Sequence, residues 1–453
     1  MMKKTPPKQI KMMMLTIEDL MPAEHLLRKL ESRIDFTFIY KKARDLYSPN
    51  GRPSIDPIVL IKILLIGFIY GINSERRLEQ EIQVNIAYKW FLGLDMDENP
   101  PDHSTMSQNR RRRFNESNLF RELFEEVVVK CYEAGIIEGK SLLTDSTHVR
   151  ANASSSKYEI KQVRRELSSY TKELDRLADI ETETLRQKGI KSKPKARKSS
   201  PPTLRRHSFT DPDSGELNRP GKPLGFHYLS HTTSDAKHGL IVDVAVTGGD
   251  RSDISVYPER IKYIKEAFNF DIKEAAADSG YNKAIAHYML EKENIALYTP
   301  TLKERNHSKT EINRASMVYD KANDCFICPN SKCLTYSNIQ RSEFGEVHKV
   351  YKTKPKDCNG CAYYEKCIAP SKRQKIIMVN ILEPFINKGK ERSQERRFKE
   401  LQRLRQIIAE GNHSLQKKYH NLSFTYKKGL SKVLEHCLFS AMALNLKRLV
   451  KYS

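Results

Sequence analysis

"GKSLLTDSTHVRANASSSK", Gly139–Lys157, is the stretch that decides the fold of this chain. A short apolar run, Leu142–Leu143, is followed almost at once by the carboxylate of Asp145 and then by small polar residues. Apolar runs of this length, bounded by turn residues, are typical of buried strands. The pattern predicts a strand over "SLLT" that ends on Asp145, so a buried strand presents an acid at its tip.

A second acid stands in the same kind of place. In "EAAADSGYNKA", Asp278 follows small apolar residues and precedes a glycine turn into a helical pattern. From Lys140 onward short apolar runs alternate with helical ones, which indicates α/β organisation. Ligands gather at the carboxyl ends of parallel strands. Two neighbouring carboxylates repel unless they are protonated or share a cation, and Mg²⁺ or Mn²⁺ with oxygen ligands suits that position.

A third acid, Glu410, lies in a helical stretch, and Lys417 follows seven residues later on the same face. An acid and a lysine on one face hold a metal and a phosphate together. Taken singly, an aspartate at a strand end is usually a turn or cap residue, and a glutamate on a helix is usually solvated. The prediction of a metal site therefore depends on all three acids, Asp145, Asp278 and Glu410, in one basic chain.

The bulk composition bounds the partners. The 453 residues carry a formal net charge of +23 and are 39% hydrophobic, enough for two to four domains. Such an excess of charge favours a polyanionic partner, nucleic acid or an anionic membrane surface, over a merely soluble basic protein. The most apolar stretch, Ile58–Ile72, contains Lys62 and is shorter than the roughly 20 residues of a span. We expect a soluble cytoplasmic protein without a signal peptide.

The first 140 residues have helical periodicity. Ser54 is a candidate cap for a helix that starts with Asp56 and Pro57, and Ser104 or Thr105 for a later one. The later helix carries a basic run, which favours a helical DNA-binding module; a helical bundle with a solvated arginine face is the alternative. The predicted DNA contacts in this run are Arg110, Arg111, Arg112 and Arg113.

A charged helix is predicted from Lys157 to about Lys188, exposed on most of its surface. The segment Lys191–Arg206 then has seven basic residues, three prolines and no acid, which is typical of a flexible basic linker. It either contacts DNA phosphates or is an insertion without a role. The predicted contacts are Lys191, Lys193, Lys195, Arg197 and Lys198.

Six of the eight cysteines fall between Cys325 and Cys367, in "DCFICPNSKC" and "DCNGCAYYEKC". Paired short-spaced cysteines on two hairpins are the spacing of a structural Zn²⁺ site, and six ligands are offered where four suffice. The alternative is a β insertion packed by buried thiols. Cys131 and Cys437 stand in apolar helical contexts and are predicted core residues.

Taken together, these motifs resemble the DDE transposases of bacterial insertion sequences, most narrowly the group numbered eleven-eighty-two. The resemblance covers most of the chain. It is carried by residues 51–113 and by "TDSTHVRANASSSK", "ADSGYNKA" and "IIAEGNHSLQKK". It implies an RNase H-like core with a helical N-terminal domain and a Cys-rich β insertion, and it implies that Asp145, Asp278 and Glu410 are metal ligands.

The resemblance also implies a domain organisation and several roles. The helical DNA-binding domain would span 1–138 and the catalytic domain 139–453, with a helical and basic insertion at about 157–207 and a zinc-ribbon-like one at about 318–380. The predicted zinc ligands are Cys328, Cys358, Cys361 and Cys367, with Cys325 and Cys333 as spares. The family has a Tyr and an Arg upstream of its glutamate, where this chain has Arg403 and Gln406, with Arg405 adjacent. Glu395 and Glu400 are rivals to Glu410 without a lysine at the matching spacing.

The implied function is DNA transposition: recognition of terminal inverted repeats, strand cleavage and transfer to target DNA by two Mg²⁺ ions. A homodimer on the paired ends, in the bacterial cytoplasm at the nucleoid, is expected from the resemblance. His148, Arg150 and Asn152 either support the site or form a hydrogen-bonded turn. The alternatives are a catalytically inactive DNA-binding regulator and a metal-dependent nuclease without strand transfer.

Overall fold

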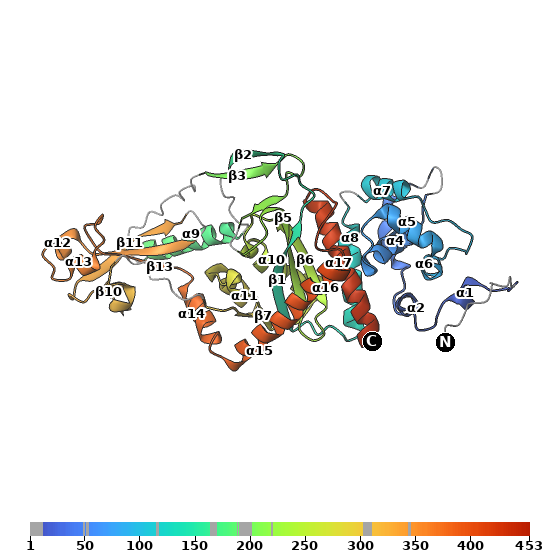
Figure 1. The fold of residues 1–453 in the computed structure, drawn as a ribbon. Helices are drawn as coiled ribbons and strands as arrows, with labels where there is room; N and C mark the ends of the chain where they lie inside the picture. Colours follow the sequence, from blue (N-terminus) through green and yellow to red (C-terminus); the bar gives the residue numbers. More distant parts are fainter. Residues whose placement is uncertain are drawn as a thin grey trace, which may run out of the picture. The chain divides into compact units, whose positions relative to one another are not determined.

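The computed structural model describes residues 12–48, 50, 54–114, 117–163, 170–187, 189, 202–218, 221–301, 310–342 and 346–453. The chain packs into two compact units (Figure 1). The helical unit comprises residues 1–138, 237–244 and 411–453, and the sheet unit comprises 139–236 and 245–410. The predicted domain ranges remain a prediction.

The helical unit is built around two helices that are far apart in sequence. α4 is apolar on nearly all sides and buried, and α17 packs against both α4 and α8, beside which it runs in Figure 1. The C-terminal helix is therefore part of the core of this unit. Its helices are α1 (Ile17–Leu20), α2 (Leu26–Glu31), α3 (Phe38–Ala43), η1 (Arg44–Leu46), α4 (Pro57–Ile69), α5 (Glu75–Val84), α6 (Ile86–Leu92), α7 (His103–Arg112), α8 (Leu119–Glu133), α16 (Gly411–Tyr419) and α17 (Leu430–Tyr452).

Two predicted helix caps were wrong. α4 is capped by Asp56, whose carboxylate accepts from the Ile58 amide at 2.7 Å, and not by Ser54. α7 is capped by Asp102, which accepts from the Ser104 amide at 2.7 Å, ahead of the predicted Ser104 or Thr105. In both cases an aspartate directly before the helix reaches the free amide two residues on. α7 also ends before Phe114, so the basic run closes one helix and does not continue into the next.

Two buried histidines in the core of the helical unit are expected to make the protein less stable in mild acid. His420 donates to the Phe68 carbonyl and His436 to the Asn421 carbonyl, both at 2.8 Å. Burial lowers the pKa of each to about 4. At pH values between about 6.5, the pKa of histidine in the unfolded chain, and about 4, the unfolded chain binds a proton at each of these histidines and the folded chain does not. The free energy of unfolding should therefore fall by up to about 2–3 kcal/mol for each unit by which the pH decreases, summed over both histidines.

Urea unfolding between pH 6.5 and 5 measures this slope. The double variant His420→Gln/His436→Gln should lose most of it, whereas the same change at the half-buried His238 should leave it. Identical slopes in the wild type and the double variant would show that other groups cause the acid sensitivity.

The sheet unit holds a mixed sheet in the order β4-β5-β1-β7-β8, with β6 also paired to β5. β1 is antiparallel to β5 but parallel to β7, and β7 is parallel to β8. α15 covers one face, where Leu401 packs on Leu143, Ala276 and Tyr298. The elements are β1 (Ser141–Arg150), β4 (Gly215–Leu217), β5 (Gly225–Asp235), η2 (Asp253–Ser255), α10 (Tyr257–Phe268), β7 (Glu274–Ala276), η3 (Ser279–Tyr281), α11 (Ala284–Lys292), β8 (Ala296–Tyr298), α14 (Glu383–Arg392), α15 (Arg396–Arg405) and η5 (Gln406–Glu410). β6 (Ile241–Gly248) belongs to this unit from residue 245 on and to the helical unit before it.

A second, antiparallel sheet has the order β13-β12-β11-β10-β9 and a core of Phe326, Leu334, Tyr351 and Ile377. Its elements are η4 (Arg314–Ser316), β9 (Val318–Asp320), β10 (Cys325–Ile327), β11 (Cys333–Arg341), β12 (Val347–Lys352), α12 (Pro355–Cys358), α13 (Tyr364–Cys367) and β13 (Ile376–Asn380). The predicted α/β class with a helical N-terminal region is confirmed.

The segment predicted as an exposed helix from Lys157 was wrong in two respects. Residues 158–163 form β2 (Tyr158–Val163), which pairs with β3 (Thr203–Ser208), and α9 begins only at Thr171 and ends at Gln187. Leu174, Ala178 and Leu185 of α9 are buried against Ile339 and Val347 of the second sheet. An apolar stripe at helical spacing therefore outweighs the high charge of this helix.

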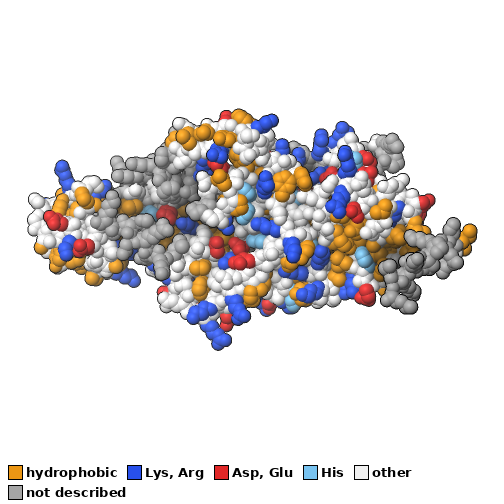
Figure 2. Space-filling model, viewed as in Figure 1, with side chains coloured by type: hydrophobic (Ala, Val, Ile, Leu, Met, Phe, Trp, Pro, Cys, Tyr) orange, Lys and Arg blue, Asp and Glu red, His pale blue; other side chains and the backbone are white. Residues whose placement is uncertain are grey.

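None of the described helices is long and apolar enough to cross a bilayer. On the face shown in Figure 2, Lys and Arg side chains lie over both units. The basic side chains are thus not confined to one of the two units.

Candidate active site

Asp145 lies inside β1 and does not end it, contrary to the prediction. β1 pairs with β5 from Leu142 to Arg150, but it pairs with β7 only over Ser141–Leu143. The strand continues past the acid because β5 supplies hydrogen-bond partners there. On its parallel side the ladder stops just before Asp145, so the acid still stands at the edge where that part of the sheet ends.

The strand register brings Asp145 and Asp278 to corresponding positions. Leu143 of β1 pairs with Ala276 of β7, and each acid lies two residues further along its own strand direction. Neighbouring strands lie about 4.8 Å apart, and residues two apart share a face. The Asp278 carboxylate accepts from the Gly280 amide at 2.8 Å, which caps η3. Its charge acts on the Asp145 carboxyl.

Glu410 reaches the same cluster through a π-helical turn. η5, between α15 and α16, is π-helical, and it packs against β1 and β5. In a π-helix the hydrogen bonds join residues five apart, so Arg405 and Glu410 lie on one side of the turn. The Arg405 guanidinium lies 3.1 Å from the Asp145 carboxylate, and the charge of Glu410 acts on Asp145.

Burial raises the pKa of the Asp145 carboxyl to about 6. The Arg405 guanidinium and the Ser146 amide, 2.8 Å from Oδ1, oppose this shift, while Asp278 and Glu410 add to it. The cluster therefore holds more negative charge than its single arginine compensates. A cation placed among the acids would favour their ionised forms.

Gln402 anchors the helix that carries this arginine. Its amide nitrogen donates to the carbonyls of Ala277 and Tyr298, both at 3.1 Å, at the ends of β7 and β8. Its amide oxygen accepts from Arg405 Nε at 3.2 Å. The orientation of Arg405 toward Asp145 is thus tied to the strand ends that carry Asp278.

The sequence analysis missed two residues beside the acids. Asp253, at the start of η2, accepts from the Ser146 hydroxyl at 2.7 Å. Tyr281 is only 1% exposed, and its hydroxyl makes no hydrogen bond of normal geometry with a described residue. Burial raises its pKa, and Asp253, Asp145 and Asp278 add to the shift. The signal for Asp253 was present in "LIVDVAVTGGDRSD", a third strand followed by a turn with acids.

The other predicted helix residues have different surroundings. Lys417 lies half-buried in α16 of the helical unit, and its position relative to the acids remains a prediction. Arg403 is exposed on α15, two residues from Arg405 and so on another side of the helix. The rivals to Glu410 have partners elsewhere: Glu395 accepts from the Tyr298 hydroxyl at 3.0 Å, and Glu400 pairs with Arg396 at 3.1 Å.

The predicted DNA-contacting arginines of α7 divide into two pairs. Arg110 makes ion pairs with Glu75 and Glu435, and Arg113 lies 4.4 Å over the Tyr47 ring, so both stabilise the helical unit. Arg111 and Arg112 are exposed. The predicted linker contacts lie outside the described residues: Lys191, Lys193, Lys195, Arg197 and Lys198.

The four cysteines predicted to bind zinc surround one small cavity of about 20 Å³. Cys328 follows β10, Cys358 ends α12, Cys361 lies in the turn that follows, and Cys367 ends α13. Burial raises the pKa of the Cys367 thiol, with Lys375 opposing and the other three cysteines adding to the shift. The cavity has about the volume of one water-sized sphere.

The remaining cysteines of this segment, Cys325 and Cys333, do not line the cavity. Their sulfur atoms lie 3.3 Å from each other. The six cysteines of this segment therefore fall into a set of four and a separate pair, and zinc binding by the four remains a prediction.

Among the described residues, one set of three potential metal ligands has all its ligand atoms within 4.8 Å: Glu79, Asp102 and His103. His103 Nδ1 lies 2.7 Å from Glu79, and Asp102 caps α7, so hydrogen bonds at a helix start account for this set. Neither the three acids nor any three of the four cysteines have all their ligand atoms within 4.8 Å of one another.

Comparison with known families places both ends of the chain. Residues 15–112 match the family described as a transposase domain (DUF772), and residues 327–450 match a transposase DDE domain. Asp145 and Asp278 lie between these ranges, and Glu410 lies within the second. No curated protein matches the chain.

Two solved structures show weak similarity. The cryo-EM structure of a piggyBac transposase synaptic complex with hairpin DNA is 10% identical, with a TM-score of 0.36 over 94% of this chain and 74% of that one. A Mos1 transposase paired-end complex with left transposon end is 10% identical, with a TM-score of 0.17 over 55% and 61%. Neither likeness is close enough to support an inference about this chain.

Proposed function

Because this chain is a DDE-type transposase, we propose that it binds the terminal inverted repeats of an insertion sequence and catalyses metal-dependent cleavage and transfer of their strands. The catalytic acids are Asp145, Asp278 and Glu410. The observation that carries this proposal is the register of β1 and β7, which sets two aspartates two residues beyond the same strand pair. A mixed sheet with one acid inside β1, where its pairing with β7 stops, and another just beyond β7 supports an RNase H-like core.

The residues of the cluster fit Mg²⁺ or Mn²⁺. All donors are carboxylate oxygens, which hard divalent cations prefer. The raised pKa of Asp145 and the buried Tyr281 hydroxyl, which makes no hydrogen bond of normal geometry with a described residue, indicate a site whose charge and polarity the protein alone does not balance. When bound, two such ions would activate the attacking oxygen and stabilise the leaving oxygen of an in-line displacement.

The chain itself contributes rigid placement. Asp145 stands on a strand paired on both sides up to Leu143, and Gln402 fixes α15 to the ends of β7 and β8. Arg405 orients the Asp145 carboxylate and keeps a positive charge where a DNA phosphate would approach. Positioning of this kind lowers the barrier because the reacting groups need no rearrangement.

The same proposal assigns the cysteine set and the partners. Cys328, Cys358, Cys361 and Cys367 would hold a structural Zn²⁺, which the cavity of about 20 Å³ among them supports. The helical N-terminal region would bind DNA, and a homodimer would bring two element ends together at the bacterial nucleoid. Lys417 would contact a phosphate beside Glu410.

The test is a strand-transfer assay on duplexes that carry the element's ends, with Mg²⁺. The wild type should cleave and join, and Asp278→Asn should do neither. Asp271→Asn is a matched control, because Asp271 is exposed in the same segment and pairs only with Lys273 among the described residues. Binding without cleavage by the wild type would favour a DNA-binding regulator, and cleavage without joining would favour a nuclease.

A further inference from the structure

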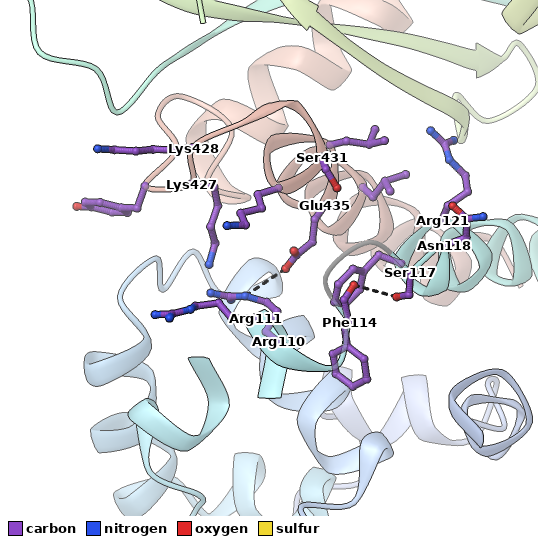
Figure 3. Close-up of a pocket in the computed structure, with 15 residues that line it drawn as sticks. Arg110, Arg111, Phe114, Ser117, Asn118, Arg121, Lys427, Lys428, Ser431 and Glu435 are labelled. Atoms are coloured by element: carbon purple, nitrogen blue, oxygen red, sulfur yellow. Dashed lines mark hydrogen bonds and ion pairs between the residues drawn. The ribbon is translucent and has the colours of Figure 1, made fainter. Parts of the chain in front are cut away.

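A basic pocket of about 330 Å³ lies within the helical unit, between the α7–α8 junction and the start of α17 (Figure 3). The side chains in Figure 3 come from two segments that are some 300 residues apart in sequence, 110–121 and 426–438. One carboxylate, Glu435, lines it together with six cations: Arg110, Arg111, Arg121, Lys427, Lys428 and Lys432.

Half of these cations are neutralised by acids. Arg110 pairs with Glu75 and lies 3.4 Å from Glu435, the contact drawn in Figure 3, and Lys427 lies 3.2 Å from Glu75. Arg121 pairs with Asp243 at 2.9 Å. The three paired cations are only partly exposed, and the contact of Arg110 with Glu435 links α7 to α17.

The other three cations make no ion pair within the described parts of the chain. Arg111 and Lys428 are exposed and make no ion pair with any described residue. Lys432 acts electrostatically on Glu435 but lies outside ion-pair distance of it. α8 and α17 also begin at the pocket, and the α8 cap residue Asn118 makes no side-chain cap. The partial positive ends of two helices therefore add to the field of the three cations.

We propose that the rim of this pocket binds one backbone phosphate of duplex DNA, with Arg111 and Lys428 as its contacts. The inference rests on the proposed function, since it takes DNA as the ligand. An arginine fork and a lysine on one rim match the oxygens of a phosphodiester. The unpaired cations stand at the exposed rim while the paired ones line the interior, so a phosphate that is part of a long polymer reaches them without entering the pocket.

The test compares two double variants of the full-length protein. Arg111→Gln/Lys428→Gln removes the rim contacts. Lys41→Gln/Arg44→Gln removes one lysine and one arginine that are also exposed, without a described ion pair, in the same unit. DNA affinity is measured against salt concentration on a duplex with an element end and on one of random sequence. The pocket variant should bind both duplexes about tenfold more weakly, with the salt slope smaller by about one.

A second measurement locates the phosphate. A neutral methylphosphonate placed at successive positions of the duplex should weaken wild-type binding at one position, and the pocket variant should be insensitive there. A far-ultraviolet circular dichroism spectrum of the pocket variant that matches that of the wild type would show that the variant's fold is intact.

Each other outcome overturns the assignment. If both double variants lost DNA affinity equally, the loss would come from the lower net positive charge and not from the pocket. An unchanged salt slope in the pocket variant, beside normal DNA binding by the wild type, would reject the pocket and leave the proposed function standing. Absence of DNA binding by the wild type would reject both. A thermal shift with inorganic phosphate that the pocket variant loses, while its DNA binding is normal, would assign the pocket to a free anion.

Discussion

An Asp145→Asn protein is expected to bind the element's ends as the wild type does, but to cleave them at least about 10²–10³-fold more slowly. The amide has nearly the same shape but lacks the charge that would hold a divalent cation between β1 and β7. Asp145 is half-buried beside Arg405 and within reach of the fields of Asp278 and Glu410. Single-turnover cleavage with Mg²⁺, beside a binding assay in its absence, separates the two effects.

The choice of the third acid is tested in the same assay. Glu410→Gln should lose as much activity as Asp145→Asn, whereas Glu400→Gln should cleave nearly as the wild type does. Glu400 is the matched control because it lies on the same run of helix and pairs with Arg396 and Arg397 away from the cluster. Inactive Glu400→Gln together with active Glu410→Gln would place the third acid ten residues upstream, at Glu400.

A Cys358→Ser protein is expected to lose bound zinc and the stability of the second sheet. Cys358 is buried at the end of α12 and lines the cavity with three other cysteines. Loss of a ligand should weaken zinc binding by more than about 100-fold, since even residues that only orient ligands contribute 10–100-fold. Structural zinc stabilises the fold around it, so residues 310–380 should become sensitive to proteolysis. Metal content by mass spectrometry and limited proteolysis measure both changes.

Cys333→Ser is the control for this prediction. Cys333 is exposed on β11 and contacts Cys325 instead of the cavity. The Cys333→Ser protein should retain about one zinc per chain and should give the wild-type pattern of fragments in limited proteolysis. A zinc site would be contradicted if the purified wild-type protein contained no zinc. It would also be contradicted if Cys358→Ser had the same zinc content and the same proteolysis pattern as Cys333→Ser.

The strand that carries Asp145 illustrates how far local pattern reaches. The apolar pair Leu142–Leu143 predicted a buried strand, and both residues are fully buried. Its end was predicted too early because "DSTHVR" has little apolar character, while β5 pairs with it through Arg150. Pairing with a strand some 80 residues later is not visible in the local sequence.

The surroundings of the acids were less accessible. Glu410 was chosen for the spacing of Lys417 on a regular helix, but the structure has a π-helical turn there, which sets Arg405 on the same side. Where the family has an arginine upstream of its glutamate, this chain has Gln406, so the sequence did not tell which residue supplies a positive charge beside the acids. In the structure the guanidinium of the adjacent Arg405 lies 3.1 Å from the Asp145 carboxylate. Asp253 went unnoticed because the strand and turn in "LIVDVAVTGGDRSD" carry several acids, and the local sequence does not tell which of them faces the cluster.

From the sequence alone follow the α/β class and the helical N-terminal region, because these depend on residue type and short-range periodicity. The three acids and the set of four cysteines remain predictions, the cysteine set being one that the family resemblance implies. Only the tertiary structure decided which partners these residues meet: the register of β1 against β7, the burial that raises the pKa of Asp145, and the packing of α17 on α4 and α8. The physical reason is that register, burial and charge pairing are properties of segments remote in the chain, and their free energies arise only when those segments come into contact.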